Sequence, residues 1–416
     1  MIKLKKHHQK FNGMFQESKW FKSNYIWGSL LDLFDDIRPY NNEEATDAML
    51  RLVQNKNFLN LLIFKKLSIT NSPFTYCYYY FSRLFVRYKL TKLLSNIESI
   101  EDFQEEISKR LQYSLDKTTD GYEFVGLDNL KANCSYLFLS NHRDIALDPA
   151  LVNLGMRQAK RDTVRIAIGD NLLSRQYAID LIRINKSFIV KRSFENRRQK
   201  LEFLKRLSSY IQESLTIDKS SVWIAQAEGR AKNGKDLTDT ALLKMLCLAK
   251  AKGEQFSEFI QKLNVIPVAI SYEYDPCIRQ KVDEIHAKRN GLDYKKSKFE
   301  DLESIVKGFL DYKGRVKVTF GHMISQNSDS VEDLAKEVDK QIHNNYCLFP
   351  SNIIAWALSN PDEQKVIDKL KKLWPRENWN HSEEKLLVHL QDFSDDLRDI
   401  AVGIYAEPVT SRLMYK

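Results

Sequence analysis

The segment Ser140–Pro149 carries the residues best suited to chemistry. His142 follows a short apolar run, and Asp144 and Asp148 lie two and six positions further on. A neutral imidazole can take a proton from an alcohol, and a carboxylate on its other ring nitrogen fixes the tautomer and stabilises the imidazolium. Such a pair needs no serine nucleophile if the substrate supplies the hydroxyl. The pattern indicates a general base; the alternative is a hydrogen-bonded loop histidine before a helix that starts at Asp148-Pro149.

Four short blocks in a fixed order extend this pattern. They are Asn141–Asp148, Ser187–Arg192, Glu228–Lys235 and Val265–Val268, which together span roughly a third of the chain. This succession resembles the glycerolipid acyltransferase superfamily, which includes glycerol-3-phosphate and lysophosphatidic acid acyltransferases. The first block resembles the family's His-(four residues)-Asp motif. The second is similar to its Phe-Ile-x-Arg block, the third to its Glu-Gly-Thr-Arg block and the fourth to its apolar block with a proline.

The resemblance leaves two candidate partners for His142. The motif's spacing would place its aspartate at Leu147, whereas Asp148 lies one residue later. We favour Asp148, because soluble members of the family resemble this chain in having Asp-Pro-Ala after the motif. Asp144 stays as the second candidate.

The resemblance implies transfer of a fatty acyl group from a thioester to a hydroxyl in phospholipid synthesis. The donor would be acyl-coenzyme A or acyl carrier protein, and the acceptor glycerol 3-phosphate or 1-acyl-glycerol 3-phosphate. His142 would act as general base, and the alcohol would attack the thioester directly without an acyl-enzyme. The acyl carrier is then a cosubstrate, and neither a metal nor another cofactor is expected.

A phosphate-bearing acceptor also needs cationic groups. Arginine offers phosphate a planar fork, while lysine acts as a mobile point charge. The third block lacks the family's threonine, so its arginine role falls on either Arg230 or Lys232. Glycine at position 229 permits an unusual turn, and Glu228 would hold a basic neighbour. The residues expected to bind substrate are Arg143, Lys191, Arg192, Glu228, Gly229, Arg230 and Lys232. For Lys191 and Arg192, the alternative is a strand end that faces solvent.

The hydrophobic pattern indicates an α/β fold with a mixed sheet flanked by helices. Apolar runs typical of strands occur at Ser135–Leu139, Val164–Ile168, Phe188–Val190, Val222–Ala225, Val265–Ile270 and Val316–Phe320. Amphipathic stretches at Asn196–Gln212 and Thr240–Ala251 separate some of them. We expect a helical N-terminal region over residues 1–125, the α/β acyltransferase domain over 126–325 and a helical C-terminal region over 326–416. Ile97–Leu111 and Val331–His343 predict helices in the outer regions.

Composition narrows the partners. The 416 residues include 64 Lys and Arg against 55 Asp and Glu, a net charge of +9. Together with 11% aromatic residues, this charge suits an anionic membrane surface, or nucleic acid as a less favoured partner. The stretch Tyr76–Leu90 mixes aromatic and basic residues as membrane interfaces do, but would equally suit a helix packed on the α/β core.

The remaining features point to a cytoplasmic protein, either soluble or peripheral on the inner face of the membrane. Five cysteines lie far apart and form no CxxC pattern, which disfavours disulfides and structural zinc. No continuous apolar segment follows the basic stretch Met1–Lys10, so no secretory signal is expected. Two other functions stay open: acyl transfer to another lysolipid or to an amine or sugar lipid, and non-catalytic binding of lipid or nucleic acid.

Overall fold

The computed structural model describes residues 33–63, 73–173, 175–297, 300–324 and 329–415. Of the helix that begins at Pro73, side chains are described from Tyr80 onward. The stretch Met1–Lys10 and the side chains of Tyr76, Tyr78 and Tyr79 therefore lie outside the described residues.

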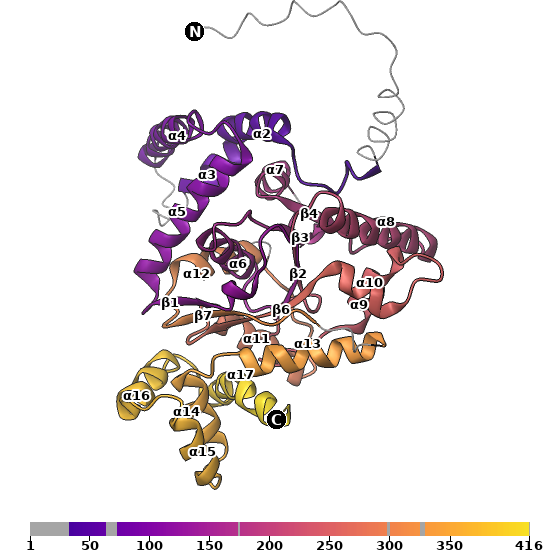
Figure 1. Cartoon of the computed structure of the whole chain (residues 1–416). Helices are drawn as coiled ribbons and strands as arrows, with labels where there is room; N and C mark the ends of the chain where they lie inside the picture. Colours follow the sequence, from indigo (N-terminus) through magenta and orange to yellow (C-terminus); the bar gives the residue numbers. More distant parts are fainter. Residues whose placement is uncertain (1–32, 64–72, 174, 298–299, 325–328, 416) are drawn as a thin grey trace, which may run out of the picture.

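Within this part of the chain, seven strands form one mixed sheet in the order β1-β7-β6-β2-β5-β3-β4 (Figure 1). All neighbouring strands are parallel except β6 and β7. The strands are β1 (Tyr122–Val125), β2 (Leu137–Ser140), β3 (Arg165–Gly169), β4 (Ser187–Val190), β5 (Val222–Ala225), β6 (Val265–Tyr272) and β7 (Val316–Phe320). The predicted fold class is confirmed, and each of the six predicted runs contributes a strand.

Helices pack on both faces of the sheet (Figure 1). Those before the sheet are α2 (Asn42–Gln54), α3 (Lys56–Ile63), α4 (Pro73–Leu94) and α5 (Ile100–Thr118). Those between strands are α6 (Leu147–Gln158), α7 (Gln176–Ile184), α8 (Arg197–Thr216), α9 (Thr240–Leu246), α10 (Phe256–Leu263), α11 (Ile278–Arg289) and α12 (Glu300–Leu310). Those after it are α13 (Val331–Asn345), α14 (Pro350–Ser359), α15 (Gln364–Lys371), α16 (Trp379–His389) and α17 (Asp395–Met414).

The central strand β2 shows why a continuous apolar run folds this way. Its four residues are all buried, as expected for a parallel strand covered on both faces. Leu137 and Leu139 point into the core beneath α8, α9 and α13, whereas Phe138 points into the core beneath α5 and α6. Because β2 is fixed in the core, the loop that follows it is held at the carboxyl edge of the sheet.

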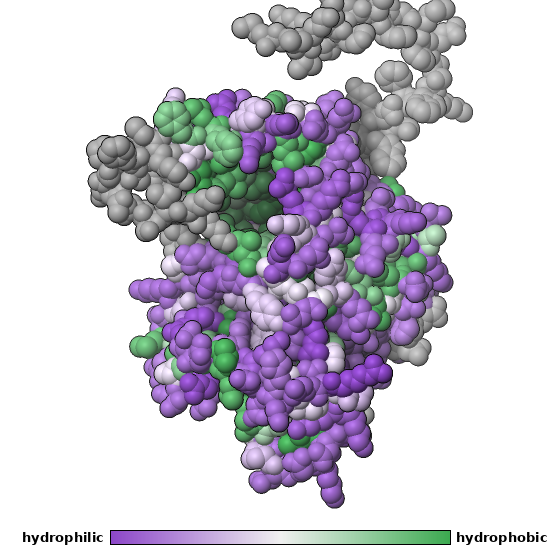
Figure 2. All heavy atoms as spheres, turned by 90° about the vertical axis from the view of Figure 1, so that its left-hand side faces the viewer, coloured by the Kyte–Doolittle hydropathy of each residue, from purple (hydrophilic) through white to green (hydrophobic). Residues whose placement is uncertain are grey.

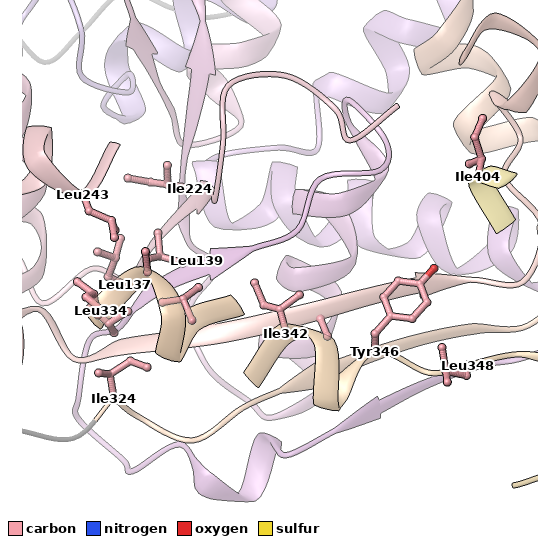
Figure 3. Close-up of a cluster of buried hydrophobic side chains, with 14 of the residues drawn as sticks. Leu137, Leu139, Ile224, Leu243, Ile324, Leu334, Ile342, Tyr346, Leu348 and Ile404 are labelled. Carbon is pink, nitrogen blue, oxygen red and sulfur yellow. The ribbon is translucent and has the colours of Figure 1, made fainter. Parts of the chain in front are cut away.

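The C-terminal helices share the core of the sheet. Figure 3 shows Leu137 and Leu139 near Leu334 and Ile342 of α13, which belong to the same buried cluster. Ile404 of α17 is part of that cluster as well. Residues from the predicted C-terminal region are thus packed directly against the strands that carry the site.

The N-terminal helices form a smaller core of their own. Ala48 and Leu52 of α2 pack with Phe103 of α5 and Ile184 of α7. The sheet itself starts with β1 at Tyr122, four residues before the boundary predicted at residue 126. This short edge strand is only partly buried, and its sequence contains Glu123. It therefore has no continuous apolar run from which it could be predicted. Among the described helices, none combines the length and apolarity required to cross a bilayer.

Candidate active site

His142 lies in the short connection between β2 and α6, at the carboxyl edge of the sheet. Its Nδ1 is 2.9 Å from Asp148 Oδ2. Asp148 occupies the first turn of α6, so its carboxylate reaches back over the loop that contains His142. With Nδ1–H donating to this carboxylate, the Nε2 lone pair is free to accept a proton. The two residues form a base and its orienting carboxylate.

The Asp148 carboxylate is fully buried and has four hydrogen-bond donors. Besides His142, the backbone N–H groups of Arg143 and Asp144 donate to Oδ2 at 2.6 and 2.9 Å. The Tyr272 hydroxyl donates to Oδ1 at 2.7 Å. Burial, and next the charge of Asp148, raise the pKa of Tyr272 well above its ordinary value, so this hydroxyl keeps its proton. These bonds compensate the burial of the carboxylate and fix its orientation.

Asp144 has a different role. Its Oδ1 accepts hydrogen bonds from the backbone N–H groups of Ala146 and Leu147 at 3.0 and 2.7 Å, where α6 begins. The side chain packs against Gly308 of α12, where a Cβ atom would lie 2.3 Å from Asp144 Oδ2. Burial, with a smaller contribution from Asp148, raises the pKa of Asp144 to about 6. Of the two candidate carboxylates, the structure brings only Asp148 to the His142 imidazole.

His142 lines a cavity of about 730 Å³ at the ends of β3, β4 and β5. One part of the lining is apolar and comes from the strands and from α8 and α9. It includes Phe188, Phe194, Leu204, Leu207, Leu242 and Met245. The other part is charged, with six basic residues (Lys191, Arg192, Lys200, Arg230, Lys232 and Lys296) against three acidic ones (Glu228, Asp239 and Asp301), so cations predominate. A cavity with one apolar and one cationic part suits an amphiphilic anion.

The loop after β5 brings the third sequence block to the first. Its backbone N–H at Ala231 donates to the His142 carbonyl at 2.8 Å. Gly229 has a φ of +80°, a conformation that glycine adopts without strain. Arg230 lines the cavity, and its Nη2 reaches Ser304 Oγ at 3.5 Å. Its Nη1 is buried and finds no hydrogen-bond partner within the described part of the chain.

Three other cations of the cavity, Lys191, Arg192 and Lys232, have acidic neighbours. Lys191 Nζ is 3.5 Å from Asp36 Oδ2. Arg192 Nη1 is 3.4 Å from Glu228 Oε1, so Glu228 contacts a basic neighbour as expected. Lys232 is paired with Glu284 of α11. Unlike these three cations, Arg230 forms no ion pair with a described carboxylate, and one of its buried nitrogens is left for a ligand.

Comparison with known proteins finds similar solved structures and a matching family model. One similar solved structure is that of the 1-acyl-sn-glycerophosphate (LPA) acyltransferase PlsC from Thermotoga maritima. The match covers 58% of this chain and 78% of the PlsC chain, with 16% sequence identity and a TM-score of 0.33. No curated protein sequence matches the chain. Residues 121–271 match the family model described as Acyltransferase. This match supports the resemblance to acyltransferases over that segment of the chain. The matched segment runs from the edge of β1 nearly to the end of β6, and so contains the loops around His142.

One residue expected to bind substrate faces away from the cavity that contains His142. The Arg143 side chain is buried, donates to Asp236 Oδ2 at 2.5 Å and to the Gly234 carbonyl at 2.9 Å, and lies over the Tyr346 ring. Arg143 does not line the cavity that contains His142. Successive side chains of an extended loop point to opposite sides, so the neighbour of a cavity-facing histidine is directed into the protein.

Sequence analysis missed the residues that hold this loop. Asp236 Oδ2 accepts from Arg143 and, at 3.3 Å, from Asn141 Nδ2, so one carboxylate fixes both neighbours of His142. Lys281 is buried, pairs with Asp275 and donates to the Arg143 carbonyl at 2.8 Å. A buried charge is costly unless it is paired, which explains why these charges are buried together. Nothing in the local sequence marks them, because Asp236 and Lys281 both lie in polar stretches.

Proposed function

We propose that this acyltransferase moves a fatty acyl group from a thioester of coenzyme A or acyl carrier protein to a hydroxyl of glycerol 3-phosphate or 1-acyl-glycerol 3-phosphate. One observation carries the proposal. The His142–Asp148 pair leaves Nε2 at a cavity that is apolar on one part of its lining and cationic on the other. The apolar part suits an acyl chain, and the cationic part suits the phosphate of the acceptor.

In this mechanism, His142 Nε2 takes the proton of the acceptor hydroxyl as its oxygen attacks the thioester carbonyl. A C–O bond forms and the C–S bond breaks, and the proton held by His142 is passed to the departing thiolate. Asp148 keeps the imidazole in the required tautomer and stabilises the imidazolium. The thioester is already activated, so these steps need neither a metal ion nor another cofactor.

The phosphate is assigned to the basic part of the cavity. Arg230 is the principal ligand in the proposal, because its Nη1 lacks a protein partner among the described residues. Arg192 and Lys191 contribute charge from the end of β4, while Glu228 and Gly229 shape the loop and Lys232 is held by Glu284. Arg143 is assigned no direct contact with substrate. Contact with an anionic membrane belongs to the same proposal, because an acylated acceptor resides there.

The test is thiol release from palmitoyl-coenzyme A by the purified protein, with glycerol 3-phosphate or lysophosphatidic acid as acceptor. Acceptor-dependent release supports the proposal and distinguishes the two acceptors. Palmitoyl-acyl carrier protein in a parallel series distinguishes the two donors. Absence of release with both donors and both acceptors, in a sample with a cooperative unfolding transition, would overturn this choice of substrates.

A further inference from the structure

A second cavity lies between the sheet and the C-terminal helices. It measures about 550 Å³ and shares no lining residue with the cavity that contains His142. Its described walls are the starts of β1 and β7, the loop between α13 and α14, the segment after α15, and α17. We call it the Arg412 cavity, after the residue that α17 contributes. The apolar part of its lining includes Val316, Leu348, Phe349, Leu373 and Trp374.

The surface around the C-terminal helices is mainly hydrophilic. These helices form the lower part of the molecule in Figure 1, and Figure 2 shows that hydrophilic residues predominate at this height on one side. Leu373 of the lining is 53% exposed, whereas Leu348 and Phe349 are each 2% exposed, so the apolar lining extends from the surface into the protein. A local apolar lining in a hydrophilic surface favours a small ligand over a broad docking face.

Four of the five charged residues in the described lining have a partner of opposite charge. Arg315 forms ion pairs with two glutamates, one before α11 and one before α16. Lys317 Nζ is 2.9 Å from Glu123 Oε2, which also belongs to the lining. Asp120 Oδ2 is 3.9 Å from Lys385 Nζ. The ligand of this cavity therefore needs to balance only the fifth charge.

The fifth charged residue is Arg412. Its Nε donates to the His343 carbonyl at 2.9 Å and its Nη2 to the Tyr346 carbonyl, so both partners are neutral. Burial lowers the pKa of Arg412, and no carboxylate of the described ranges raises it. Arginine nevertheless keeps its charge in proteins. A half-buried charge without a counter-ion is costly, so this position favours one negative charge on the ligand.

The Arg412 cavity and His142 lie at the same edge of the sheet. The strands β6 and β7 are antiparallel, so β7 starts where β6 ends. The carbonyl of Tyr346 accepts from Arg412, and its ring lies 5.3 Å from the guanidinium carbon of Arg143. Arg412 is therefore linked through Tyr346 to the residue that follows His142, although the two cavities are separate.

We infer that the Arg412 cavity binds an amphiphilic monoanion, a single carboxylate on an apolar body. The planar guanidinium of Arg412 suits a carboxylate, and the apolar lining suits the body of the ligand. A volume of about 550 Å³ lies within the range of about 300–1,000 Å³ that is usual for small-molecule sites. The inference goes beyond the proposed acyl transfer, because no residue of the His142 cavity takes part in it.

The experiment labels the full chain with decanoate that carries a photoreactive diazirine on its chain, and maps the labelled peptides by mass spectrometry. We expect labels at Leu348–Phe349 and Leu373–Trp374. Arg412→Gln keeps a donor for the carbonyls but removes the charge, so labelling there should fall about tenfold or more. Leu373→Glu changes an exposed side chain and adds a repelling charge, so labelling should fall about fivefold or more. The matched control is Leu358→Glu on α14, which is 46% exposed and does not line the cavity.

Competition provides a second arm. Unlabelled decanoate and 2-naphthoate distinguish an aliphatic from an aromatic body, and uncharged decanamide should compete about tenfold less than decanoate. Labels confined to the His142 cavity would overturn the inference. So would equal labelling of Leu373→Glu and the wild type, an equal loss in Leu358→Glu, or failure of both acids to compete. Labelling requires no turnover, so its failure leaves the proposed acyl transfer intact, and absence of thiol release leaves this site intact.

Discussion

The two sides of His142 are built in opposite ways. On the Nδ1 side, Asp148 is fully buried and accepts four hydrogen bonds, none longer than 2.9 Å. On the Nε2 side, Arg192 and Lys191 are partly exposed, and their ion pairs measure 3.4 and 3.5 Å. We call these the anchored side and the cavity side. The base is held in one geometry, whereas the cations can adjust to a ligand.

This difference separates two kinds of loss. Substitutions on the anchored side should lower turnover, because they disturb the base that acts in the transition state. Substitutions on the cavity side should raise KM for the acceptor, because they remove groups that bind its phosphate before and during reaction. The comparison would fail if a variant on the anchored side changed mainly KM, or if a variant on the cavity side changed mainly turnover.

The largest effect is expected for His142→Ala. Without the imidazole, the site loses the base that takes the hydroxyl proton, and turnover should fall about 10²–10⁴-fold. The measurement is acceptor-dependent thiol release at saturating substrates. The unfolding midpoint should stay close to that of the wild type, because His142 contributes one hydrogen bond to the core. Turnover within about threefold of the wild type would remove His142 from the role of base.

The second prediction compares the two carboxylates. Asp148→Asn keeps the size of the side chain but cannot stabilise the imidazolium, so turnover should fall about 10²-fold or more. Asp144→Asn keeps an oxygen for the N–H groups at the start of α6, so turnover should fall less than about tenfold. The same thiol-release assay serves for both. The reverse order would mean that Asp144 is the working partner in solution.

The third prediction tests the cavity side. Arg230→Ala should raise KM for glycerol 3-phosphate about 10–100-fold, the loss expected for a charge-assisted hydrogen bond to phosphate. Lys232→Ala is the matched control, because the Lys232 ammonium is occupied by Glu284 and its loss should change KM less. Glycerol as acceptor provides a second control, since it has no phosphate. A lower kcat with unchanged KM in Arg230→Ala would place this residue with the base.

The fold was largely predictable because four of the seven described strands, β2, β4, β5 and β6, are buried on both faces over most of their length. Runs such as Val265–Ile270 are apolar without interruption. The strand β6 contains this whole run and ends two residues later, at Tyr272. The edge strand β1 was missed, since Tyr122–Val125 is half solvated and contains Glu123. A strand has a continuous apolar sequence only where other elements of the protein cover both of its faces.

The site was predictable only where its residues are close in sequence. His142 and Asp148 lie on one loop and one helical turn, so their contact follows from six residues of chain. Tyr272 meets Asp148 across 124 positions, and Asp236 meets Arg143 across 93. No local spacing encodes such contacts, because β6 and the loop after β5 reach the site through the order of strands in the sheet.

The fourth prediction sharpens the anchored side by removing one bond. Tyr272→Phe deletes the hydroxyl that donates to Asp148 Oδ1 and leaves the ring in place. Turnover should fall about 5–10-fold, the cost of one hydrogen bond that orients the carboxylate. The measurement is acceptor-dependent thiol release, with the urea unfolding midpoint of the variant as the control. Lower stability with unchanged turnover would mean that this hydroxyl serves the fold and not the base.

The smallest effect concerns stability at Asp144. Its pKa is raised to about 6 in the folded protein, mainly by burial, above the ordinary value of 3.8. A raised pKa means that the ionised carboxylate opposes folding above about pH 6, and that this cost disappears as the pH falls below the unfolded value. Asp144→Asn removes the ionisation. It should therefore be more stable than the wild type by about 1–3 kcal/mol at neutral pH, with the difference shrinking towards about pH 4.

Urea denaturation across this pH range measures the free energy of unfolding for both proteins. Asp128→Asn, at an exposed position, is the control and should run parallel to the wild type at every pH. A stability difference for Asp144→Asn that does not change with pH would mean that packing against Gly308 outweighs the charge. If Asp144→Asn keeps its turnover and its stability difference depends on pH, Asp144 shapes the loop. Asp148 is then the carboxylate that serves His142.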